Sequence, residues 1–209
     1  MSTVKVARFL FGLMVAVAAP VLAAAGCSGD DEESPPGGSS GDAGARLDAP
    51  FRPDASCPVV IESPELIKGE HVPEGTELSW SSNPPSSGPH YPVWATFQEY
   101  AAPVPRAYLV HSMEHGAVLL LYKCDQPCPA IVDELRKVRD AIAPDPLCSD
   151  PIRARVIIAP DPLLDVPVAA AAWGWTYKAE CVDAPTLTQF ARDHYAQGPE
   201  NTCSPGRAF

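Results

Sequence analysis

The sequence has no stretch that is dense in lysine and arginine. Its 209 residues include 15 basic and 26 acidic side chains, which give a formal net charge of −11 at pH 7. A protein that binds DNA or RNA needs a basic surface to neutralise phosphates, so a nucleic-acid partner is not expected. The acidity is compatible with solubility and with the attraction of cations, and by itself it proves neither.

The sequence also lacks an apolar run long enough for a comfortable membrane span. The first candidate, Phe9 to Leu22, follows Lys5 and Arg8, and this order is typical of a secretory signal peptide. Small residues then lead to Cys27, which resembles the lipobox of a bacterial lipoprotein. We therefore expect residues 1–26 to be removed and Cys27 to carry lipid. The alternative is an ordinary secretory signal in which this cysteine is incidental.

Either kind of signal would place the protein outside the cytoplasm without a transmembrane helix. Because Ser28 rather than an acid follows Cys27, retention in the outer membrane is expected if the source is Gram-negative. Cleavage would remove two basic residues and no acidic ones, so the net charge would change from −11 to −13. The membrane is therefore an expected partner, reached through the lipid.

Large apolar side chains are scarce between residues 27 and 56, where only Leu47 and Phe51 occur. Such a segment cannot bury enough apolar surface to offset the entropy that it would lose on ordering, so we expect a disordered tether. Residues 57–209 are long enough for one globular domain with a sufficient core. The expected organisation is thus a signal peptide, a tether and a single domain.

Free thiols are not expected in that domain. The sequence has seven cysteines, and the six that remain without Cys27 are Cys57, Cys124, Cys128, Cys148, Cys181 and Cys203. An even number in an oxidising compartment indicates three disulfides, whose connectivity the sequence leaves open. A bridge from Cys128 to Cys148 would be strained, because an expected helix separates the two residues. Cys124 and Cys128 could alternatively bind a soft metal ion.

The domain is expected to be α+β, with a mostly antiparallel sheet, two amphipathic helices and a long Pro-rich N-terminal loop region over residues 57–105. The continuous apolar run from Ala117 to Tyr122 predicts a central strand that is covered on both faces. The other expected elements are strands over 154–159 and 168–175 and helices over 129–142 and 185–197. Aromatic residues in the loop region indicate that it is ordered against a core.

Histidine is scarce, with five residues, but three of them lie near the expected central strand. His111 and His115 enclose Glu114 directly before the apolar run, and His90 lies in a rigid Pro/Gly segment. His111 and His115 would share one face of either a strand or a helix, so both alternatives bring the imidazoles together. The sequence therefore predicts a metal site for copper or zinc, formed by His90, His111, His115 and Glu114.

Other residues have weaker claims to this site. Met113 would favour copper(I) if it shared the same face, because its thioether is a soft ligand. His71 and His194 are isolated in the sequence and are expected on the surface. The tryptophans expected in the core or in the wall of a pocket are Trp94, Trp173 and Trp175.

Several motifs resemble those of the bacterial proteins grouped as domain of unknown function 3105. The resemblance covers about residues 75–200 and is most specific in Pro84-Pro-Ser-Ser-Gly-Pro-His-Tyr91 and Val110-His-Ser-Met-Glu-His-Gly116. It also includes Trp94, Tyr122 and Phe190, and the pieces Ala172-Trp-Gly174 and Gly198-Pro-Glu200, which are weak alone. The resemblance implies a secreted or membrane-anchored protein but no particular reaction. The six cysteines of the domain are additional to the common pattern.

Two functions of different classes follow. The first is an extracytoplasmic, membrane-anchored lipoprotein with a copper or zinc site, for metal handling or metal-dependent chemistry. The second is a non-catalytic cell-envelope interaction module in which the histidines are structural. A narrower, enzymatic interpretation treats His111 to His115 as the His-x-x-Glu-His motif of inverzincin metalloproteases, with Glu180 or Glu200 as the distant ligand. Gly116 argues against it, because it leaves room for only a short helix after Pro105.

Overall fold

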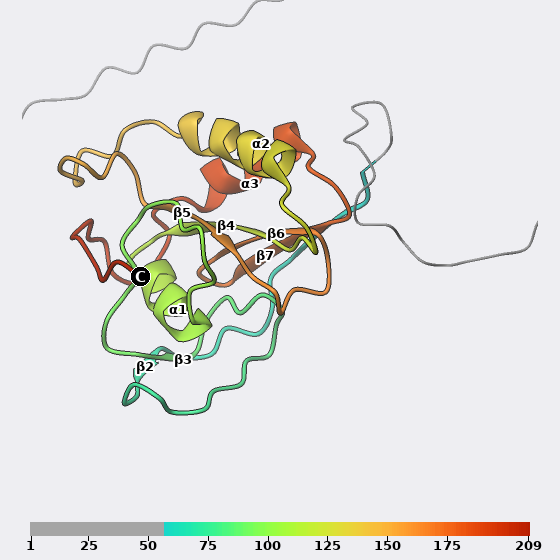
Figure 1. Cartoon of the computed structure of the whole chain (residues 1–209). Coiled ribbons are helices and arrows are strands. Elements are labelled where there is room, and N and C mark those ends of the chain that lie inside the picture. Colours follow the sequence, from blue (N-terminus) through green and yellow to red (C-terminus); the bar gives the residue numbers. More distant parts are fainter. Residues whose placement is uncertain (1–56) are drawn as a thin grey trace, which may run out of the picture. The chain divides into compact units, whose positions relative to one another are not determined.

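A computed structural model describes residues 57–209, and the expected signal peptide, tether and Cys27 lie outside the described residues. The described part is built around a five-stranded sheet with the order β1-β7-β6-β4-β5 (Figure 1). Its strands are β1 (Val59–Glu62), β4 (Val118–Tyr122), β5 (Val156–Pro160), β6 (Val168–Ala172) and β7 (Trp175–Ala179). The strand β4 lies inside the sheet, between β6 and β5.

The sheet is mixed but mostly antiparallel. β4 pairs antiparallel with β6, β6 with β7 and β7 with β1, whereas β4 and β5 are parallel. A parallel pair needs a crossover connection, and helix α2 (Pro129–Asp140) supplies it. The prediction of an α+β fold with a mostly antiparallel sheet is therefore confirmed.

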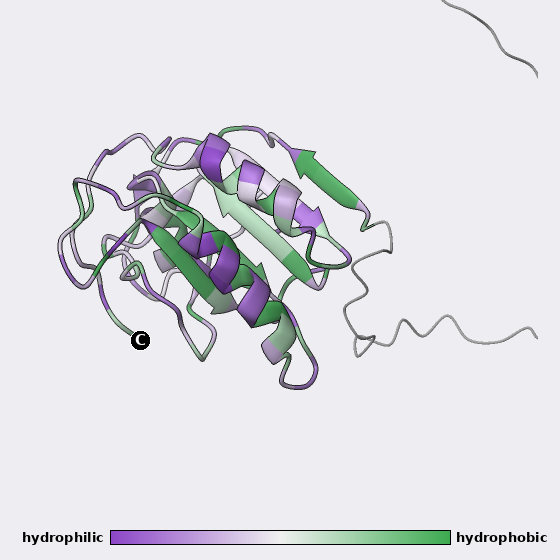
Figure 2. Cartoon of the chain, turned by 90° about the horizontal axis from the view of Figure 1, so that it is seen from above, coloured by the Kyte–Doolittle hydropathy of each residue, from purple (hydrophilic) through white to green (hydrophobic). Residues whose placement is uncertain are grey.

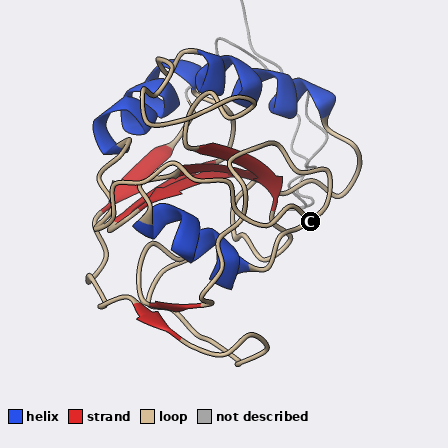
Figure 3. Ribbon diagram, turned by 90° about the vertical axis from the view of Figure 1, so that its left-hand side faces the viewer, coloured by secondary structure: helices blue, strands red, loops and turns tan. Residues whose placement is uncertain are grey.

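Helices cover both faces of the sheet. α2 and α3 (Ala184–His194) lie side by side on one face, and α1 (Arg106–Glu114) lies on the other (Figure 3). Side chains of β4 alternate between two cores: Leu119 and Leu121 pack with α1, whereas Val118 and Leu120 pack with α2 and α3. Burial on both faces explains why this run is continuously apolar, as predicted.

The two helices that share one face, α2 and α3, are amphipathic. Figure 2 shows their polar and apolar stripes over the apolar strands. α2 begins at Pro129, which suits the first turn because no N–H donor is needed there. α3 is capped by Asp183, whose carboxylate accepts a hydrogen bond from the Thr186 N–H at 3.1 Å. Both helices end earlier than predicted, at Asp140 and His194.

Two elements were not predicted in their observed form. α1 is buried over seven consecutive residues, from Ala107 to Met113, so it has no polar face and no helical periodicity in its sequence. The strand predicted over 168–175 is confirmed only as far as Ala172, where β6 ends, because the chain turns back at Gly174, whose φ is 77°. β7 then pairs with β6 as a hairpin.

The proline-rich region before α1 is ordered, as predicted. Phe97 and Tyr100 are buried and join the core between the sheet and α1. Two short strands, β2 (Glu70–His71) and β3 (Pro89–His90), form a separate parallel ladder in which the two histidines pair. The ladder lies beside α1, on the side away from the sheet (Figure 3). Histidines from distant parts of the loop region are thereby placed side by side.

Three disulfides connect the six cysteines of residues 57–209. The pairs are Cys57–Cys181, Cys124–Cys128 and Cys148–Cys203, with sequence separations of 124, 4 and 55. The Cys124–Cys128 bridge replaces the alternative of a soft-metal site at these two thiols. Disulfides persist in oxidising compartments, so the bridges indicate an extracytoplasmic protein. Within residues 57–209, no helix is both long and apolar enough to cross a membrane.

The segment after α3 closes against the end of α1. The Ala196 N–H donates to the Gly116 carbonyl at 3.0 Å, and the Glu200 N–H donates to the Glu114 carbonyl at 2.9 Å. Gly198 lies between these two bonds, where an added Cβ would collide with backbone atoms at the end of α1. The two segments are therefore in direct backbone contact, which only glycine permits at position 198.

Gly198→Ala should lower the free energy of unfolding by about 2–3 kcal/mol, because the new methyl group forces closely packed backbone apart. Gly75→Ala is the matched control: its φ is 87°, but an added Cβ would meet no atom within 4 Å. Only backbone strain of about 1 kcal/mol is expected there. Urea titration of the oxidised proteins, followed by tryptophan fluorescence, measures both losses. Equal losses would contradict the close contact at Gly198.

Candidate metal centre

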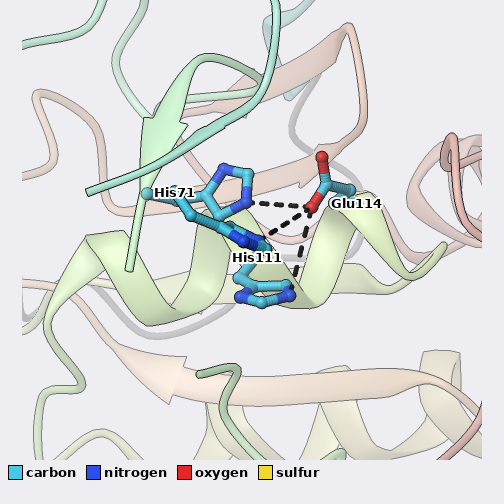
Figure 4. Close-up of side chains that lie close together, drawn as sticks. His71, His111 and Glu114 are labelled. Carbon is cyan, nitrogen blue, oxygen red and sulfur yellow. Dashed lines mark hydrogen bonds and ion pairs between the residues drawn. The ribbon is translucent and has the colours of Figure 1, made fainter. Parts of the chain in front are cut away.

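Three segments bring histidines together at the end of α1. The last turn of α1 carries His111 and Glu114 on one face, because residues i and i+3 are neighbours on a helix. The β2–β3 ladder adds His71 and His90. One ligand atom from each of these four side chains lies within 4.8 Å of every other, and together they form the histidine–glutamate cluster. Figure 4 shows His71 and His111 pointing toward the Glu114 carboxylate.

The Glu114 carboxylate is the centre of the histidine–glutamate cluster. Its Oε2 atom lies 2.9 Å from His90 Nε2, 3.7 Å from His71 Nε2 and 4.0 Å from His111 Nε2. The side chains of His90 and His111 are 0% and 3% exposed, and that of Glu114 is 13% exposed. The side chain of His71 is 52% exposed. The cluster is therefore buried except on the side of His71, where solvent reaches it.

Backbone carbonyls orient the two buried imidazoles. His90 Nδ1 lies 2.8 Å from the Gly88 carbonyl, and His111 Nδ1 lies 2.6 Å from the Tyr91 carbonyl. A carbonyl oxygen only accepts hydrogen bonds, so both Nδ1 atoms carry a proton and donate it. In neutral rings, both Nε2 atoms then present a lone pair to the cluster. Histidine ligands of metals in proteins have this arrangement.

The contact between His90 Nε2 and Glu114 Oε2 is short enough for a shared proton or for a bound cation. At 2.9 Å a lone pair and a carboxylate oxygen face each other, and neither has a proton to share when the ring is neutral. A proton or a metal ion resolves this conflict. His111 does not supply the proton at neutral pH, because burial lowers its pKa to about 4 despite the opposing hydrogen bond to Tyr91. The cluster thus combines a neutral imidazole with a carboxylate that needs a cation.

His115 lies next to the histidine–glutamate cluster but outside it. Its Nε2 atom is 3.1 Å from His111 Nε2 and 3.1 Å from the Glu200 carboxylate. Burial lowers the pKa of His115, and the negative charge of Glu200 only partly opposes this effect. Its Nδ1 atom is buried without a hydrogen-bond partner, and Trp94 packs against the ring with centroids 4.3 Å apart. His111, His115 and Glu200 therefore form a second donor set, which shares His111 with the first.

The residues predicted as metal ligands meet at one place. His90, His111 and Glu114 belong to the histidine–glutamate cluster, and His115 is directly adjacent to it. His71 is exposed, as expected, but it is not isolated. Its ring centroid lies 5.0 Å from that of His90 and 4.7 Å from that of His111. This proximity depends on the register of β2 against β3, which no pattern in the sequence indicates.

The other residues considered for the site pack against neighbouring side chains and do not join the donor atoms of the cluster. Met113 is fully buried in the core between α1 and the sheet, so its thioether does not support a copper(I) site. His194 stacks on Trp175, with ring centroids 4.4 Å apart. Trp173 is a wall of the histidine–glutamate cluster, together with Gly69. A Cβ added at Gly69 would collide with the central carboxylate and approach the Trp173 ring.

A buried charge network holds the carboxyl end of α1. Arg155 Nη1 donates to the His115 carbonyl at 2.9 Å, while its Nε and Nη2 donate to Asp145 at 2.9 and 2.8 Å. The Tyr195 hydroxyl donates to the same carboxylate at 2.7 Å. Burial raises the pKa of Asp145, but hydrogen bonds from Tyr195, the Leu147 N–H and Arg155 outweigh burial and lower it overall. No motif marks this network in the sequence, because its members are far apart in the chain.

Asp145→Asn should destabilise the protein by about 3–5 kcal/mol at neutral pH, because it leaves the Arg155 charge buried without its partner. Glu134→Gln, in an exposed pair with Lys137, is the control and should cost less than about 1 kcal/mol. Thermal melts from about pH 3 to 7 measure both variants.

The pH dependence of this stabilisation has a definite sign. The pKa of Asp145 is lower in the folded state than its ordinary value of 3.8, so the stabilisation is present above that value. It is lost as the pH falls further and the folded-state carboxylate becomes protonated. The difference in stability between Asp145→Asn and the unchanged protein should therefore be largest at neutral pH and smallest in acid. Equal stability of the two proteins at neutral pH would contradict a structural role for the network.

The whole candidate metal centre lies in a stretch that one protein-family model recognises. The model described as Protein of unknown function (DUF3105) matches residues 71–206, which include every member of both donor sets. No curated protein and no solved structure matches the chain. The family match covers well over half of the 209 residues. This protein therefore belongs to the DUF3105 family.

Proposed function

We propose that this protein binds one zinc or copper(II) ion at the histidine–glutamate cluster, outside the cytoplasm and anchored to a membrane by lipid on Cys27. One observation carries the metal proposal: the Nε2 atoms of His90 and His111 lie 2.9 and 4.0 Å from Glu114 Oε2, while the Nδ1 atoms of both rings bond to backbone carbonyls. Neutral imidazoles and carboxylates are ligands that zinc and copper(II) accept. The partly exposed His71 completes a set of four side chains.

The spacing of the donor atoms supports a single ion. Four ligands that each lie about 2.0–2.1 Å from a tetrahedral metal are about 3.3–3.4 Å from one another. The distances from Glu114 Oε2 to the three Nε2 atoms, 2.9, 3.7 and 4.0 Å, bracket this value. Small side-chain shifts therefore suffice for coordination. The carbonyls of Gly88 and Tyr91 would hold the two buried rings in place while the ion binds.

Metal handling is the role that this arrangement supports best. Three of the four ligands are buried and held by backbone or helix contacts, which favours affinity. The fourth, His71, is half exposed on a short strand, so it offers a ligand that solvent or another donor can displace. An ion would enter and leave on that side. A carrier of copper(I) is disfavoured, because Met113 is buried in the core and the ligands are hard or intermediate donors.

Metal-dependent hydrolysis is a second candidate function. It is supported by the 3.1 Å contact between His115 Nε2 and the Glu200 carboxylate, because a distant glutamate is the third ligand in inverzincins. His111 and His115 are also one turn apart, at the end of α1. In such a site the glutamate beside the histidines acts as the general base. Glu114 instead faces His90, which favours the histidine–glutamate cluster.

The location and the chain organisation are parts of the same proposal. Residues 1–26 would act as a lipoprotein signal, residues 27–56 as a tether and residues 57–209 as the metal-binding domain. The order of basic, apolar and small residues before Cys27 supports the anchor. The three disulfides support an extracytoplasmic location. The outer membrane is proposed if the source is Gram-negative.

The purified protein should bind about one equivalent of zinc or copper(II), as measured by elemental analysis and calorimetric titration. His90→Ala and His111→Ala should each abolish stoichiometric binding, because each variant removes a buried ligand. His71→Ala should weaken binding about 10–100-fold, since two buried imidazoles and the carboxylate remain. His194→Ala is the matched control and should bind as the unchanged protein does. The affinity for the metal should also weaken as the pH decreases, because protons compete with the metal for imidazole.

Two further variants separate the donor sets. His115→Ala and Glu200→Gln should retain stoichiometric binding if the ion lies in the histidine–glutamate cluster. Loss of binding in these two variants, but not in His71→Ala, would assign the ion to the second donor set and favour hydrolysis. Absence of binding in the unchanged protein would overturn the metal proposal. A non-catalytic interaction module, with a proton between His90 and Glu114, would then remain.

Cys27→Ser should release the protein from membranes or block its processing, because the thiol that would carry the lipid is missing. Ser28→Ala is the control and should remain in the membrane fraction. Cell fractionation and mass spectrometry of the mature N-terminus measure both outcomes. An unmodified Cys27 at the mature N-terminus would contradict lipidation and leave an ordinary secreted protein.

A further inference from the structure

One disulfide lies where the central strand meets the first turn of a helix. Cys124 follows β4 after a single residue, and Cys128 occupies the N-cap position of α2. β4, α2 and β5 form a β-α-β unit, since the two strands pair in parallel. A cysteine pair beside such a unit is typical of thiol–disulfide exchange sites, although their usual C-x-x-C spacing is one residue shorter. The position of the bridge therefore points to more than cross-linking.

The start of α2 favours negative charge on Cys128. The first N–H groups of a helix have no partner within it, and they form the positive end of the helix dipole. The Cys128 carbonyl accepts hydrogen bonds from the N–H groups of Ile131 and Val132 at 3.1 and 3.3 Å, which places this cysteine at the beginning of the helix. A thiolate is stabilised at such a position. Cys128 is therefore suited to leave as a thiolate when the bridge is attacked.

The other two bridges contact the hydrophobic cores, although only Cys203 among their four cysteines is buried. Cys57 packs against the core beneath α2 and α3, and Cys203 is buried in the core beside α1 with Cys148 against it. Their sequence separations of 124 and 55 mean that each closes a long loop, whereas Cys124 and Cys128 are only 4 apart. A bridge that closes a short loop constrains the unfolded chain least. The Cys124–Cys128 bridge is the one whose opening disturbs the fold least.

A cavity of about 580 Å³ borders this bridge. Its lining includes both half-buried cysteines together with apolar surface from Tyr122, Val132 and Pro160. Cavities with apolar walls and a few polar groups are typical binding sites. The cavity offers a place for a substrate chain directly beside the bridge.

We propose that Cys124 and Cys128 form a redox site that exchanges its disulfide with paired thiols of a peptide or protein substrate. A substrate thiolate attacks Cys124 Sγ, the bond to Cys128 breaks, and the Cys128 sulfur leaves as a thiolate at the start of α2. The second substrate thiolate then attacks the substrate sulfur of the mixed disulfide and expels Cys124. Two electrons pass from the substrate to the bridge. The substrate leaves as a disulfide, and the two protons of its thiols end on the thiols of Cys124 and Cys128.

This site is independent of the proposed metal centre. His115 precedes β4 and Cys124 follows it, so the two sites lie at opposite ends of the same strand. The five residues of β4 span about 17 Å at about 3.3 Å per residue. Failure of one proposal therefore leaves the other standing, and the two tests use different variants.

Controlled reduction tests the proposal. The purified full-length protein is equilibrated with increasing concentrations of reduced glutathione, the free thiols are alkylated, and the cysteine peptides are analysed by mass spectrometry. The Cys124–Cys128 bridge should open at a thiol concentration at least about 10-fold lower than the other two, while tryptophan fluorescence stays native. Opening of all three bridges together, or only with loss of the native signal, would overturn the proposal.

A transfer assay separates a redox site from a merely exposed bridge. The oxidised protein should convert a synthetic dithiol peptide to its disulfide and become reduced only at Cys124 and Cys128. In Cys128→Ser the free Cys124 thiol should react with oxidised glutathione, accumulate a Cys124–glutathione mixed disulfide and release one reduced glutathione. The double variant Cys124→Ser/Cys128→Ser should fold, bind metal as before and show no transfer. The proposal would also be overturned if the oxidised protein oxidised the dithiol peptide no faster than oxidised glutathione alone does.

Discussion

The burial of α1 between the sheet and the proline-rich loops is the constraint on which the site depends. All residues from Ala107 to Met113 are buried, including the polar side chains of His111 and Ser112. Buried polar groups must find partners, so Ser112 bonds to the backbone of Ala95 and His111 bonds to the Tyr91 carbonyl. These bonds join the helix to the loop that carries His90. The packing of one helix thus orients the ring of His111 and holds the loop that carries His90 beside it.

The same burial favours a cation at the cluster. A carboxylate that faces imidazole lone pairs with little solvent is costly unless positive charge compensates it. Nearby, the Arg155 charge is already matched by Asp145, so it does not serve Glu114. A proton in the contact between His90 and Glu114, or a metal ion, would supply this compensation. Burial lowers the pKa of His111 to about 4, and its Nε2 atom lies 3.1 Å from His115 Nε2 and 4.0 Å from Glu114 Oε2, so a metal ion at the cluster would satisfy more of these groups than a proton would.

The elements and ligands that the sequence predicted share one property: their signal is local. The apolar run of β4, the periodicity of α2 and α3 and the concentration of histidines near position 111 are all visible within a few residues. α1 escaped prediction because burial on every side removes the polar face that periodicity needs. The end of β6 was likewise missed, because the apolar sequence continues from its alanines into Trp173 and gives no sign of the hairpin turn. His71 could not be assigned to the site from the sequence, and Glu200 was named only as an alternative to Glu180, because strand register and the returning C-terminal segment bring these residues to α1.

X-ray absorption spectroscopy of the zinc-loaded protein tests the central claim most directly. Coordination by His71, His90, His111 and Glu114 predicts three nitrogen ligands and one oxygen ligand at about 2.0–2.1 Å, with multiple scattering from the imidazole rings. His71→Ala should remove one imidazole contribution and leave the others. A spectrum of oxygen neighbours without imidazole scattering would contradict the account, because the ion would then be bound to surface carboxylates instead of the buried histidines.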